Sequence, residues 1–486
     1  MTHALVTELA PGEGLFVDGR WKAGSTGTFD VEDPATGEVI AAVSDGDAAD
    51  AVAAADAAAR AFPAWSRTAP RQRSEALHRT FELMIADTDR LAAIIALENG
   101  KALSDARAEV VYAAEFFRWY AEEAVRGGGS YGPSPAGGTR TIVTRRPVGV
   151  AALVTPWNFP AAMATRKIAP ALAAGCTVVL KPAAETPLTA LAVARVLREA
   201  GVPDGVVNVV PTTDAGGVVG AWLAHPRVRK LSFTGSTAVG RLLLRQAADR
   251  VVNTSMELGG NAPFVVTDDA DVEAAVAGAL IAKLRNGGQA CTAANRFYVH
   301  ADVVDEFASA FGAAVEALRV GPASSPETQI GPLISRGAVD GVAALVSAAV
   351  DAGAVVSHRA PVPSGGGYYY PPTVLRDVPS GAEILRTEIF GPVAPIVTWT
   401  SEEELLSLVN DGEYGLTAYV YSRDLQRALR IAEAVDAGMV GINRGVVSDP
   451  AAPFGGVKQS GVGREGAREG LEAFEEIQYL SVDWPL

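Results

Sequence analysis

The sequence predicts an α/β protein whose sheets are mainly parallel. From residue 148 onward, short runs rich in β-branched residues alternate with helical segments, as in successive βαβ units. A second alternation of the same kind begins near residue 262, which indicates a second α/β unit. A Gly- and Pro-rich stretch, 127–135, separates the first unit from a mostly helical N-terminal region.

The elements are expected in a regular order. Helical periodicity covers 47–62 and 71–125, the latter in more than one piece, and 139–147 alternates like an exposed strand. The first unit should then contain strands at 149–155, 177–181, 206–210 and 230–234 and helices at 160–173, 186–200, 214–224 and 236–249. The second should contain strands at 262–267, 295–300, 393–399, 417–422 and 439–443 with helices between them, followed by a last strand at 475–482.

Composition limits the classes of function to consider. The chain of 486 residues is 49% apolar and 20% charged, as folded globular proteins are, and its net charge of -15 argues against a nucleic acid partner. Its five histidines do not cluster at metal-ligand spacing, so no metal site is expected, and two cysteines cannot form a disulfide framework. The first 20 residues lack a signal-peptide pattern, and no apolar run is long enough to span a membrane. We therefore expect a cytoplasmic protein with no membrane partner.

Cys291 is the first candidate for a chemical role. It lies in a polar, Gly-rich segment, 286–296, whereas Cys176 lies in an apolar run typical of a structural cysteine. A partly accessible thiol with a stabilised thiolate can act as a nucleophile. From this context alone, a structural thiol is still the commoner interpretation.

Other polar residues follow predicted strands. Segment 233–240 passes from a strand through a Gly turn into a helix, where free amides would favour a pyrophosphate, although such turns are also ordinary architecture. Lys181 is either a ligand contact at the carboxyl edge of a parallel sheet or a solvated lysine. Glu257 is either a general base or a solvated or capping carboxylate, and Asn158 either donates to an oxyanion or shapes a turn.

Several motifs occur together in one order along the chain. They are TPWNFP from Thr155, LKPA around Lys181, FTGST followed by Gly240, MELGGNAP around Glu257, GGQAC ending at Cys291, EIFGP from Glu388 and PFGGVKQSG from Pro453. In this combination the chain resembles the aldehyde dehydrogenase superfamily from about residue 10 to its C-terminus. Several motifs in the order of the family are far more specific evidence for the resemblance than any single motif.

The resemblance implies that the protein oxidises an aldehyde to a carboxylate. The thiolate of Cys291 attacks the aldehyde carbonyl, and the side-chain amide of Asn158 and the backbone amide of Cys291 stabilise the oxyanion. Transfer of a hydride to a nicotinamide leaves a thioester, and Glu257 acts as the general base that activates water to hydrolyse it.

The resemblance also implies a site for NADP or NAD. Lys181 is expected at the adenosine ribose, Gly235 and Ser236 at the pyrophosphate, and Glu388 with Phe390 at the nicotinamide ribose. The other residues expected to bind the cofactor are Thr155, Pro156, Trp157 and Ala184. Ala184 stands where the family often has a Glu that repels a 2′-phosphate, so NADP is permitted unless Glu185 reaches the ribose.

A domain organisation follows from the same resemblance. It places a Rossmann-type cofactor-binding domain at 1–130 and 148–256, a catalytic domain at 257–445, a return segment at 446–474 and oligomerisation strands at 139–147 and 475–486. The strands are expected to pair subunits into homodimers or homotetramers.

Within the superfamily, the chain most resembles succinate-semialdehyde dehydrogenases. Arg166, Arg285 and Ser448 match positions that hold the substrate carboxylate in that subfamily, and arginines suit a carboxylate because they donate in a bidentate fork. The expected substrate is therefore succinic semialdehyde, with glutarate semialdehyde or another aldehyde, including a neutral one, as the alternative. Arg444 either extends this cationic lining or points to solvent. Ala293 replaces a second cysteine of some relatives, so Cys291 cannot form a disulfide there.

Other classes of function fit the sequence less well. A CoA-acylating dehydrogenase usually lacks the residue that matches Glu257, and a cysteine hydrolase needs a histidine partner, which no motif supplies. A structural protein on the same fold would be free to lose Cys291, Asn158 or Glu257, and all three are present.

Overall fold

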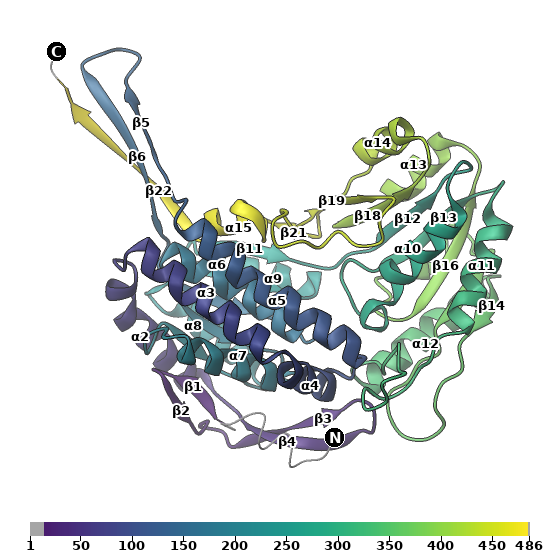
Figure 1. The fold of residues 1–486 in the computed structure, drawn as a ribbon, viewed down its shortest axis with the longest axis horizontal. Helices are drawn as coiled ribbons and strands as arrows, with labels where there is room; N and C mark the ends of the chain where they lie inside the picture. Colours follow the sequence, from purple (N-terminus) through teal and green to yellow (C-terminus); the bar gives the residue numbers. More distant parts are fainter. Residues whose placement is uncertain (1–13, 485–486) are drawn as a thin grey trace.

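The computed structural model of the chain describes residues 14–484. Residues 1–13 and 485–486 lie outside the described residues. The outer ends of the predicted segments 1–130 and 475–486, and most of the first 20 residues in which no signal peptide was expected, therefore lie there. Figure 1 shows two lobes side by side and a narrow arm that projects from one of them.

The first lobe is built on an eight-stranded sheet in the order β2-β1-β9-β8-β7-β10-β11-β21. Its parallel centre consists of β7 (Val150–Val154), β8 (Thr177–Lys181), β9 (Val207–Val209), β10 (Val228–Thr234) and β11 (Asn253–Glu257). Every residue of β7 and β8 is buried, because helices cover both faces of the sheet. Strands β7 to β10 match the four strands of the first predicted alternation, and β11 was not among them.

Two groups of helices cover the two faces. One face packs against α3 (Pro70–Ala86), α4 (Thr88–Asn99), α5 (Leu103–Ala124), α6 (Pro160–Ala174) and α7 (Pro187–Glu199). The other packs against α2 (Ala48–Trp65), α8 (Ala215–Ala224) and α9 (Thr237–Ala248). Successive residues of β7 alternate between the faces, so that Leu153 contacts the first group and Ala152 the second. The predicted helical region 71–125 is divided into α3, α4 and α5, and α4 ends at Gly100 with φ 86°.

The second lobe contains a seven-stranded sheet in the order β14-β15-β16-β13-β12-β18-β19. Its strands are β12 (Ala262–Val266), β13 (Ala294–His300), β14 (Val355–Arg359), β15 (Thr373–Arg376), β16 (Val393–Trp399), β18 (Thr417–Tyr421) and β19 (Met439–Ile442). Its helices are α10 (Val272–Leu284), α11 (Val304–Glu316), α12 (Arg336–Asp351), α13 (Glu402–Asn410) and α14 (Leu425–Ala434). All pairs except β14 with β15 are parallel, as expected for the second alternation.

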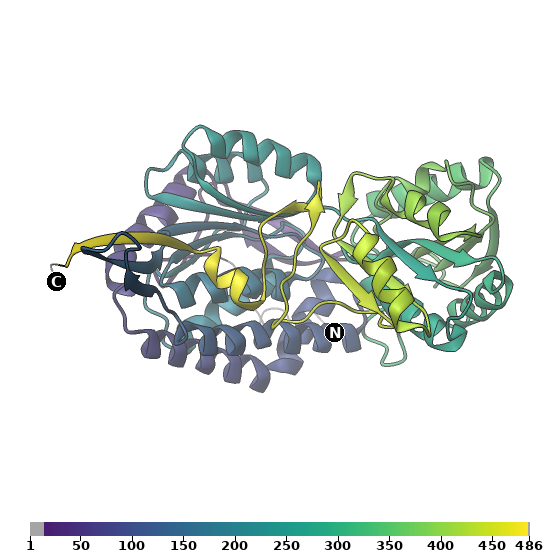
Figure 2. The same cartoon turned by 90° about the horizontal axis from the view of Figure 1, so that it is seen from above.

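Several antiparallel strands were not predicted. Strands β1 (Leu15–Val17), β2 (Arg20–Lys22) and β21 (Gly461–Val462) lie toward the edges of the eight-stranded sheet, and two separate two-stranded sheets are formed by β3 (Thr28–Asp33) with β4 (Glu38–Ser44) and by β17 (Tyr414–Gly415) with β20 (Val457–Lys458). Strands of two or three residues, which β3 and β4 are not, carry too little periodicity to be recognised. Strand β21 matters most, because it returns the chain from the second lobe to the edge of β11, before α15 (Ala467–Glu472) (Figure 2).

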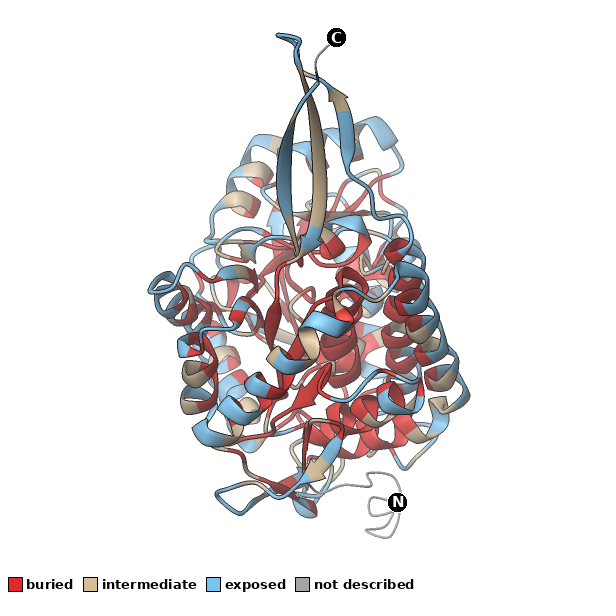
Figure 3. Ribbon diagram, turned by 90° about the vertical axis from the view of Figure 1, so that its left-hand side faces the viewer, coloured by how far each residue is buried: buried red, intermediate tan, exposed pale blue. Residues whose placement is uncertain are grey.

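The arm consists of β5 (Ser130–Pro133), β6 (Thr139–Pro147) and β22 (Glu475–Asp483). Strand β6 lies between the other two and pairs with β22 along its whole length. Figure 3 shows the arm standing away from the buried body of the first lobe. It exposes large apolar side chains to solvent, among them Tyr131 (64%), Ile477 (67%) and Tyr479 (58%). Within residues 14–484, no helix has both the length and the apolar character needed to cross a membrane.

Candidate active site

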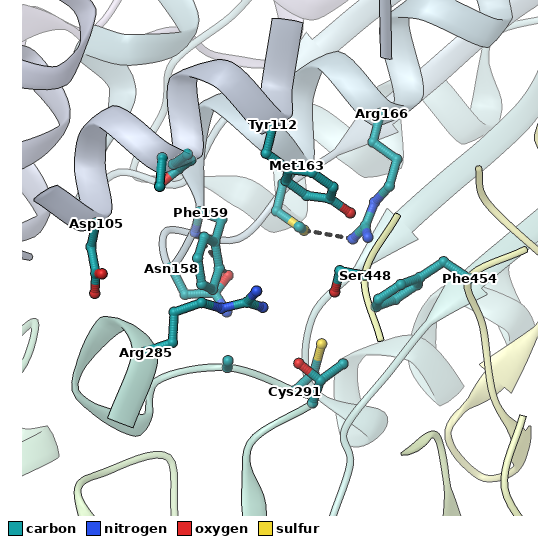
Figure 4. Close-up of a pocket in the computed structure, with 14 residues that line it drawn as sticks. Asp105, Tyr112, Asn158, Phe159, Met163, Arg166, Arg285, Cys291, Ser448 and Phe454 are labelled. Carbon is teal, nitrogen blue, oxygen red and sulfur yellow. Dashed lines mark hydrogen bonds between the residues drawn. The ribbon is translucent and has the colours of Figure 1, made fainter. Parts of the chain in front are cut away.

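Two cavities meet at Cys291. Cavity A has a volume of about 90 Å³, and its lining includes Tyr112, Arg166, Arg285, Cys291, Ser448 and Phe454 (Figure 4). Cavity B has a volume of about 300 Å³, and its lining includes Trp157, Gly235, Ser236, Cys291, Glu388 and Phe390. Asn158 and Met163 also line both cavities. The thiol therefore lies where the contents of the two cavities would meet.

Close backbone contacts fix the loop that carries Cys291. After α10 the chain turns through Asn286, Gly287 and Gly288, all in the left-handed region, with φ between 53° and 78°. A Cβ atom on Gly288 would lie 2.4 Å from the carbonyl oxygen of Gly391, and one on Gly260 would lie 2.2 Å from the carbonyl oxygen of Cys291. Larger side chains at Gly288 or Gly260 would displace this loop, so the GG and LGG motifs have a steric reason.

The Cys291 side chain is half-buried. Burial raises the pKa of the thiol to about 12, and the positive charge of Arg166 opposes this rise. Burial thus favours the protonated thiol and Arg166 favours the thiolate, so attack would be helped by a proton acceptor or a further positive charge near Cys291. Cys176 is buried among apolar side chains and contacts the carbonyl oxygen of Phe474, as a structural cysteine would.

Asn158 lies in the turn between β7 and α6. Its Nδ2 donates to the carbonyl oxygen of Gln289 at 3.0 Å, and its Oδ1 accepts from the backbone N–H of Phe159 at 3.1 Å. Because an amide nitrogen carries two hydrogens, one N–H is left for another acceptor. The side chain is buried, so its orientation is fixed by these two bonds.

A buried ion pair supports the Asn158 turn, and sequence reasoning missed it. Lys101 donates to the carbonyl oxygen of Asn158 at 2.8 Å and forms a salt bridge with Glu109, and neither side chain is exposed. Glu109 Oε1 also accepts the backbone N–H groups of Ala161 and Ala162, at 2.9 and 3.2 Å, at the start of α6. The only signal in the sequence is a pair of charged residues beside an apolar helical stretch, which ordinarily indicates a solvated helix face.

Glu257 ends β11, where it pairs in register with Thr234 and Gly461. Both of its carboxyl oxygens are buried, and neither has a hydrogen-bond partner among the described residues. Burial raises its pKa well above the usual value, and the nearby carboxylate of Glu465 adds to the rise. Glu257 is not part of the lining of cavity A or B. The Glu257 carboxyl group is therefore buried outside the lining of both cavities.

A second buried cluster lies behind Arg166. Glu465 contacts Arg166 Nε at 2.7 Å and Lys167 Nζ at 2.5 Å, and Lys167 also donates to Ser232 at 3.0 Å. Burial alone would raise the pKa of Glu465, but the charges of Lys167 and Arg166 lower it below its usual value. The cluster was not predicted, because Glu465 lies in a segment that reads as an ordinary polar loop.

The predicted residues Arg166, Arg285 and Ser448 all line cavity A. Besides Glu465, two neighbours hold the Arg166 guanidinium, whose carbon lies 4.1 Å from the centre of the Phe454 ring and whose Nη2 is 3.0 Å from Met163 Sδ. Arg285 is half-buried and lies 5.2 Å from the centre of the Phe159 ring.

Arg444 does not extend this lining. It is exposed, lies outside cavity A and donates to the carbonyl oxygen of Val446 at 2.9 Å. The sequence left two alternatives open for Arg444, and the structure favours the one in which its side chain points to solvent.

The remaining predicted residues lie around cavity B or beside it. Pro156, Trp157, Gly235, Ser236, Glu388 and Phe390 line the cavity. Thr155, Lys181 and Ala184 do not, although the Thr155 N–H donates to the Lys181 carbonyl where β7 and β8 end side by side.

The chemistry of cavity B fits a nucleotide. Ser236 is the N-cap of α9, so the free N–H groups of the first helical turn are available beside the cavity for an anion. The rings of Trp157 and Phe390 meet edge to face, with centres 5.5 Å apart. Glu388 accepts the backbone N–H of Gly260 through Oε1, which leaves Oε2 for hydroxyl groups. Burial raises the pKa of Glu388 to about 7. The part of the chain that the structure describes contains no group of three or more His, Cys, Asp or Glu residues suited to a metal ion.

Comparison with known proteins agrees with this arrangement. The chain matches the aldehyde dehydrogenase family over residues 21–480. It is 54% identical over 448 residues to a succinate-semialdehyde dehydrogenase of Paenarthrobacter nicotinovorans, which covers 92% of this chain and 99% of the relative. It is 48% identical over 466 residues to a glutarate-semialdehyde dehydrogenase of Pseudomonas aeruginosa, which covers 96% of each chain.

A solved structure gives the same result for the fold. The crystal structure of an E. coli NADP-dependent enzyme matches with a TM-score of 0.96 at 45% identity, over 98% of this chain and 99% of that chain. The predicted fold class, α/β of the aldehyde dehydrogenase type, is therefore confirmed. Sequence motifs, fold and family match agree, and the chain belongs to the aldehyde dehydrogenase family.

Proposed function

We propose that this protein oxidises succinic semialdehyde to succinate with NADP or NAD. The observation that carries the proposal is the position of Cys291 between a small cavity, whose lining includes Arg166 and Arg285, and a larger cavity suited to a nucleotide. An aldehyde whose other end is anionic would enter cavity A and present its carbonyl group to the thiol. The similarity to a succinate-semialdehyde dehydrogenase supports the same substrate.

In the proposed first step, the Cys291 thiolate attacks the aldehyde carbon and the carbonyl oxygen becomes an oxyanion. The free N–H of Asn158 and the backbone N–H of Cys291 stabilise that charge, and the ion pair below Asn158 keeps its amide in place. The positive charge of Arg166, which lowers the pKa of the thiol, favours the thiolate. Nicotinamide bound in cavity B supplies the hydride acceptor.

In the proposed second step, Glu257 accepts a proton from the water that hydrolyses the Cys291 thioester. Its two unpartnered carboxyl oxygens support this role, since they are not committed to other groups of the described chain. Its raised pKa brings the carboxyl group closer to neutral pH, where a general base works well. Because Glu257 lies outside both cavities, a rotation of its side chain must bring it to the thioester.

Substrate recognition is proposed to rest on Arg166, Arg285 and Ser448. All three line cavity A, and their guanidinium and hydroxyl groups are hydrogen-bond donors that suit a carboxylate. Glutarate semialdehyde, which is one methylene longer, is the second candidate. It is favoured by the similarity to a glutarate-semialdehyde dehydrogenase.

For the cofactor, we propose that NADP is accepted as well as NAD. Glu185 is exposed, and its charge acts on buried Lys181, while Ala184 presents no carboxylate to repel a 2′-phosphate. The similarity to an NADP-dependent enzyme supports this proposal.

We further propose that the arm is an oligomerisation element that joins subunits into a homodimer or homotetramer. Its exposed apolar side chains support this role, because contiguous apolar surface marks interfaces. The domain division given above, with a cofactor domain at 1–130 and 148–256, a catalytic domain at 257–445 and a return segment at 446–474, belongs to the same proposal. Both cysteines are free, which supports a reducing, cytoplasmic location.

An activity panel tests the substrate proposal. Succinic semialdehyde, glutaric semialdehyde and neutral butanal would each be assayed with NAD and NADP by the absorbance of the reduced cofactor. We expect kcat/KM for succinic semialdehyde to exceed that for butanal by roughly a hundredfold, as ionic hydrogen bonds to the carboxylate would give.

Arg285→Met, which keeps the chain length but removes the charge, should abolish most of this preference. It is a better test than a change at Arg166, whose loss would leave Glu465 short of a buried partner. Equal kcat/KM values of the wild type for succinic semialdehyde and butanal would reject carboxylate recognition.

A further inference from the structure

A tyrosine hydroxyl of cavity A lacks a partner. Tyr112 lies on α5 at the same face as Asp105, Ala108 and Glu109, so the helical spacing directs it toward the cavity. Figure 4 shows its ring beside Met163, which contacts Arg166 directly, with the hydroxyl group pointing toward Arg166 and Ser448. The hydroxyl group is buried and makes no hydrogen bond of good geometry with a described residue, although Ser448 and Arg166 lie close enough to lower its pKa.

A buried hydroxyl without a good hydrogen bond to the protein is less favourable than one that is fully paired. A Phe at this position would fill the same space without that cost. The position of Tyr112 is informative, since it lines the cavity beside Arg166, which can only donate, and Ser448, which can donate or accept. Such an arrangement is suited to an acceptor that enters the cavity from outside.

We propose that Tyr112 is a specificity-determining residue, whose hydroxyl donates a hydrogen bond to the anionic end of the substrate. This inference rests on the proposed function, and it adds a fourth donor to Arg166, Arg285 and Ser448. Burial raises the pKa of Tyr112, although the charges of Arg166 and Arg285 oppose the rise. The hydroxyl group therefore keeps its proton at neutral pH and acts as a donor, as an anionic acceptor requires.

The inference predicts opposite effects of Tyr112→Phe on stability and on activity. Because the hydroxyl group makes no hydrogen bond of good geometry with a described residue, its removal should leave the thermal unfolding midpoint unchanged or higher. The kcat/KM for succinic semialdehyde should fall by roughly tenfold to a hundredfold, as loss of a hydrogen bond to a charged group does. The kcat/KM for butanal should change by less than about twofold, since butanal has no acceptor at that end.

Tyr120→Phe is the matched control. Tyr120 lies two turns further along α5, its hydroxyl group is likewise buried without a partner among the described residues, and it does not line cavity A. The same chemical change there should leave the ratio of the two kcat/KM values as in the wild type. Competitive inhibition by succinate provides a readout without turnover, and its inhibition constant should rise in Tyr112→Phe only.

The outcomes separate this inference from the proposed function. If the wild type prefers succinic semialdehyde to butanal and Tyr112→Phe keeps that preference, the role of Tyr112 is refuted and the proposed function stands. If the wild type shows no such preference, the carboxylate substrate itself is refuted, and with it the partner assigned to Tyr112. A loss of activity toward both substrates in Tyr112→Phe, with an unchanged ratio, would also overturn the inference, since it would indicate a structural role.

Discussion

Replacing Glu109 by Gln should test whether the buried ion pair below Asn158 supports catalysis. Gln keeps an oxygen for the backbone N–H groups of Ala161 and Ala162, and its size is nearly unchanged. What the change removes is the negative charge beside Lys101, which is completely buried, and it turns an NH2 donor in place of a carboxylate oxygen toward the Lys101 ammonium. The perturbation therefore isolates the ion pair from the packing around it.

The magnitude follows from the fate of Lys101. Leaving one member of a buried ion pair without its partner costs about 3–5 kcal/mol. Lys101 could instead lose its proton, and this sets an upper limit to the loss of stability, because neutralising an ordinary lysine at pH 7 costs about 4.6 kcal/mol. We expect the free energy of unfolding to fall by about 3–4 kcal/mol.

The catalytic effect should appear in kcat. Lys101 and Asn286 both donate to the carbonyl oxygen of Asn158, each at 2.8 Å, so weakening one bond lets the oxyanion amide move. Loss of a whole oxyanion donor lowers kcat by about a hundredfold to a thousandfold, and a displaced donor should cost less, roughly tenfold to a hundredfold. KM should change little, because Arg166, Arg285 and Ser448 are untouched.

The assays are equilibrium urea unfolding and steady-state kinetics, with a double variant as control. Adding Lys101→Met to Glu109→Gln removes the unpaired charge, so most of the lost stability should return. Activity should not return, because Met cannot donate to the Asn158 carbonyl. In an Asn158→Ala background, Glu109→Gln should lower kcat little further, since the ion pair acts through that side chain. An unfolding free energy and a kcat both close to wild type in Glu109→Gln would refute the reasoning.

Three further predictions concern the reacting groups. Cys291→Ala should abolish turnover but leave cofactor binding intact by fluorescence titration, and residual turnover above background would exclude Cys291 as the nucleophile. Glu257→Gln should still form the thioester, seen as a burst of reduced cofactor, but should block its hydrolysis. Because burial raises the pKa of Glu257, the steady-state turnover of the wild type should increase with pH, whereas that of the variant should not. Glu388→Gln should abolish the pH dependence of cofactor affinity, because Glu388, with a pKa of about 7, gains its charge and acceptor strength as pH rises through neutrality. A wild-type affinity that does not increase with pH, or a variant with the same profile, would contradict that role.

Much of the site was accessible from the sequence because its residues follow the ends of predicted strands. Asn158 follows β7, Gly235 follows β10 and Glu257 ends β11, and parallel neighbours bring these ends to one edge. What could not be predicted depends on pairs that are distant in sequence. Lys101 and Asn158 are 57 residues apart, and Lys167 and Glu465 are 298 apart, so no local pattern marks either contact. Short edge strands such as β21 were missed for a related reason, since their partners, and not their own periodicity, make them strands.

The α/β alternation, the family and the identity of the proposed reacting groups could be predicted from the chain alone, because periodicity and ordered motifs are local properties of a sequence. Which groups share a cavity, and which of their hydrogen bonds are already occupied, depends on the three-dimensional packing. It placed Arg444 in solvent and held Glu257 back from both cavities. It also left the Tyr112 hydroxyl unpartnered beside Arg166. Burial and hydrogen bonding depend on how α5, α6 and the returning C-terminal segment pack together, and that packing is set by contacts across the whole chain.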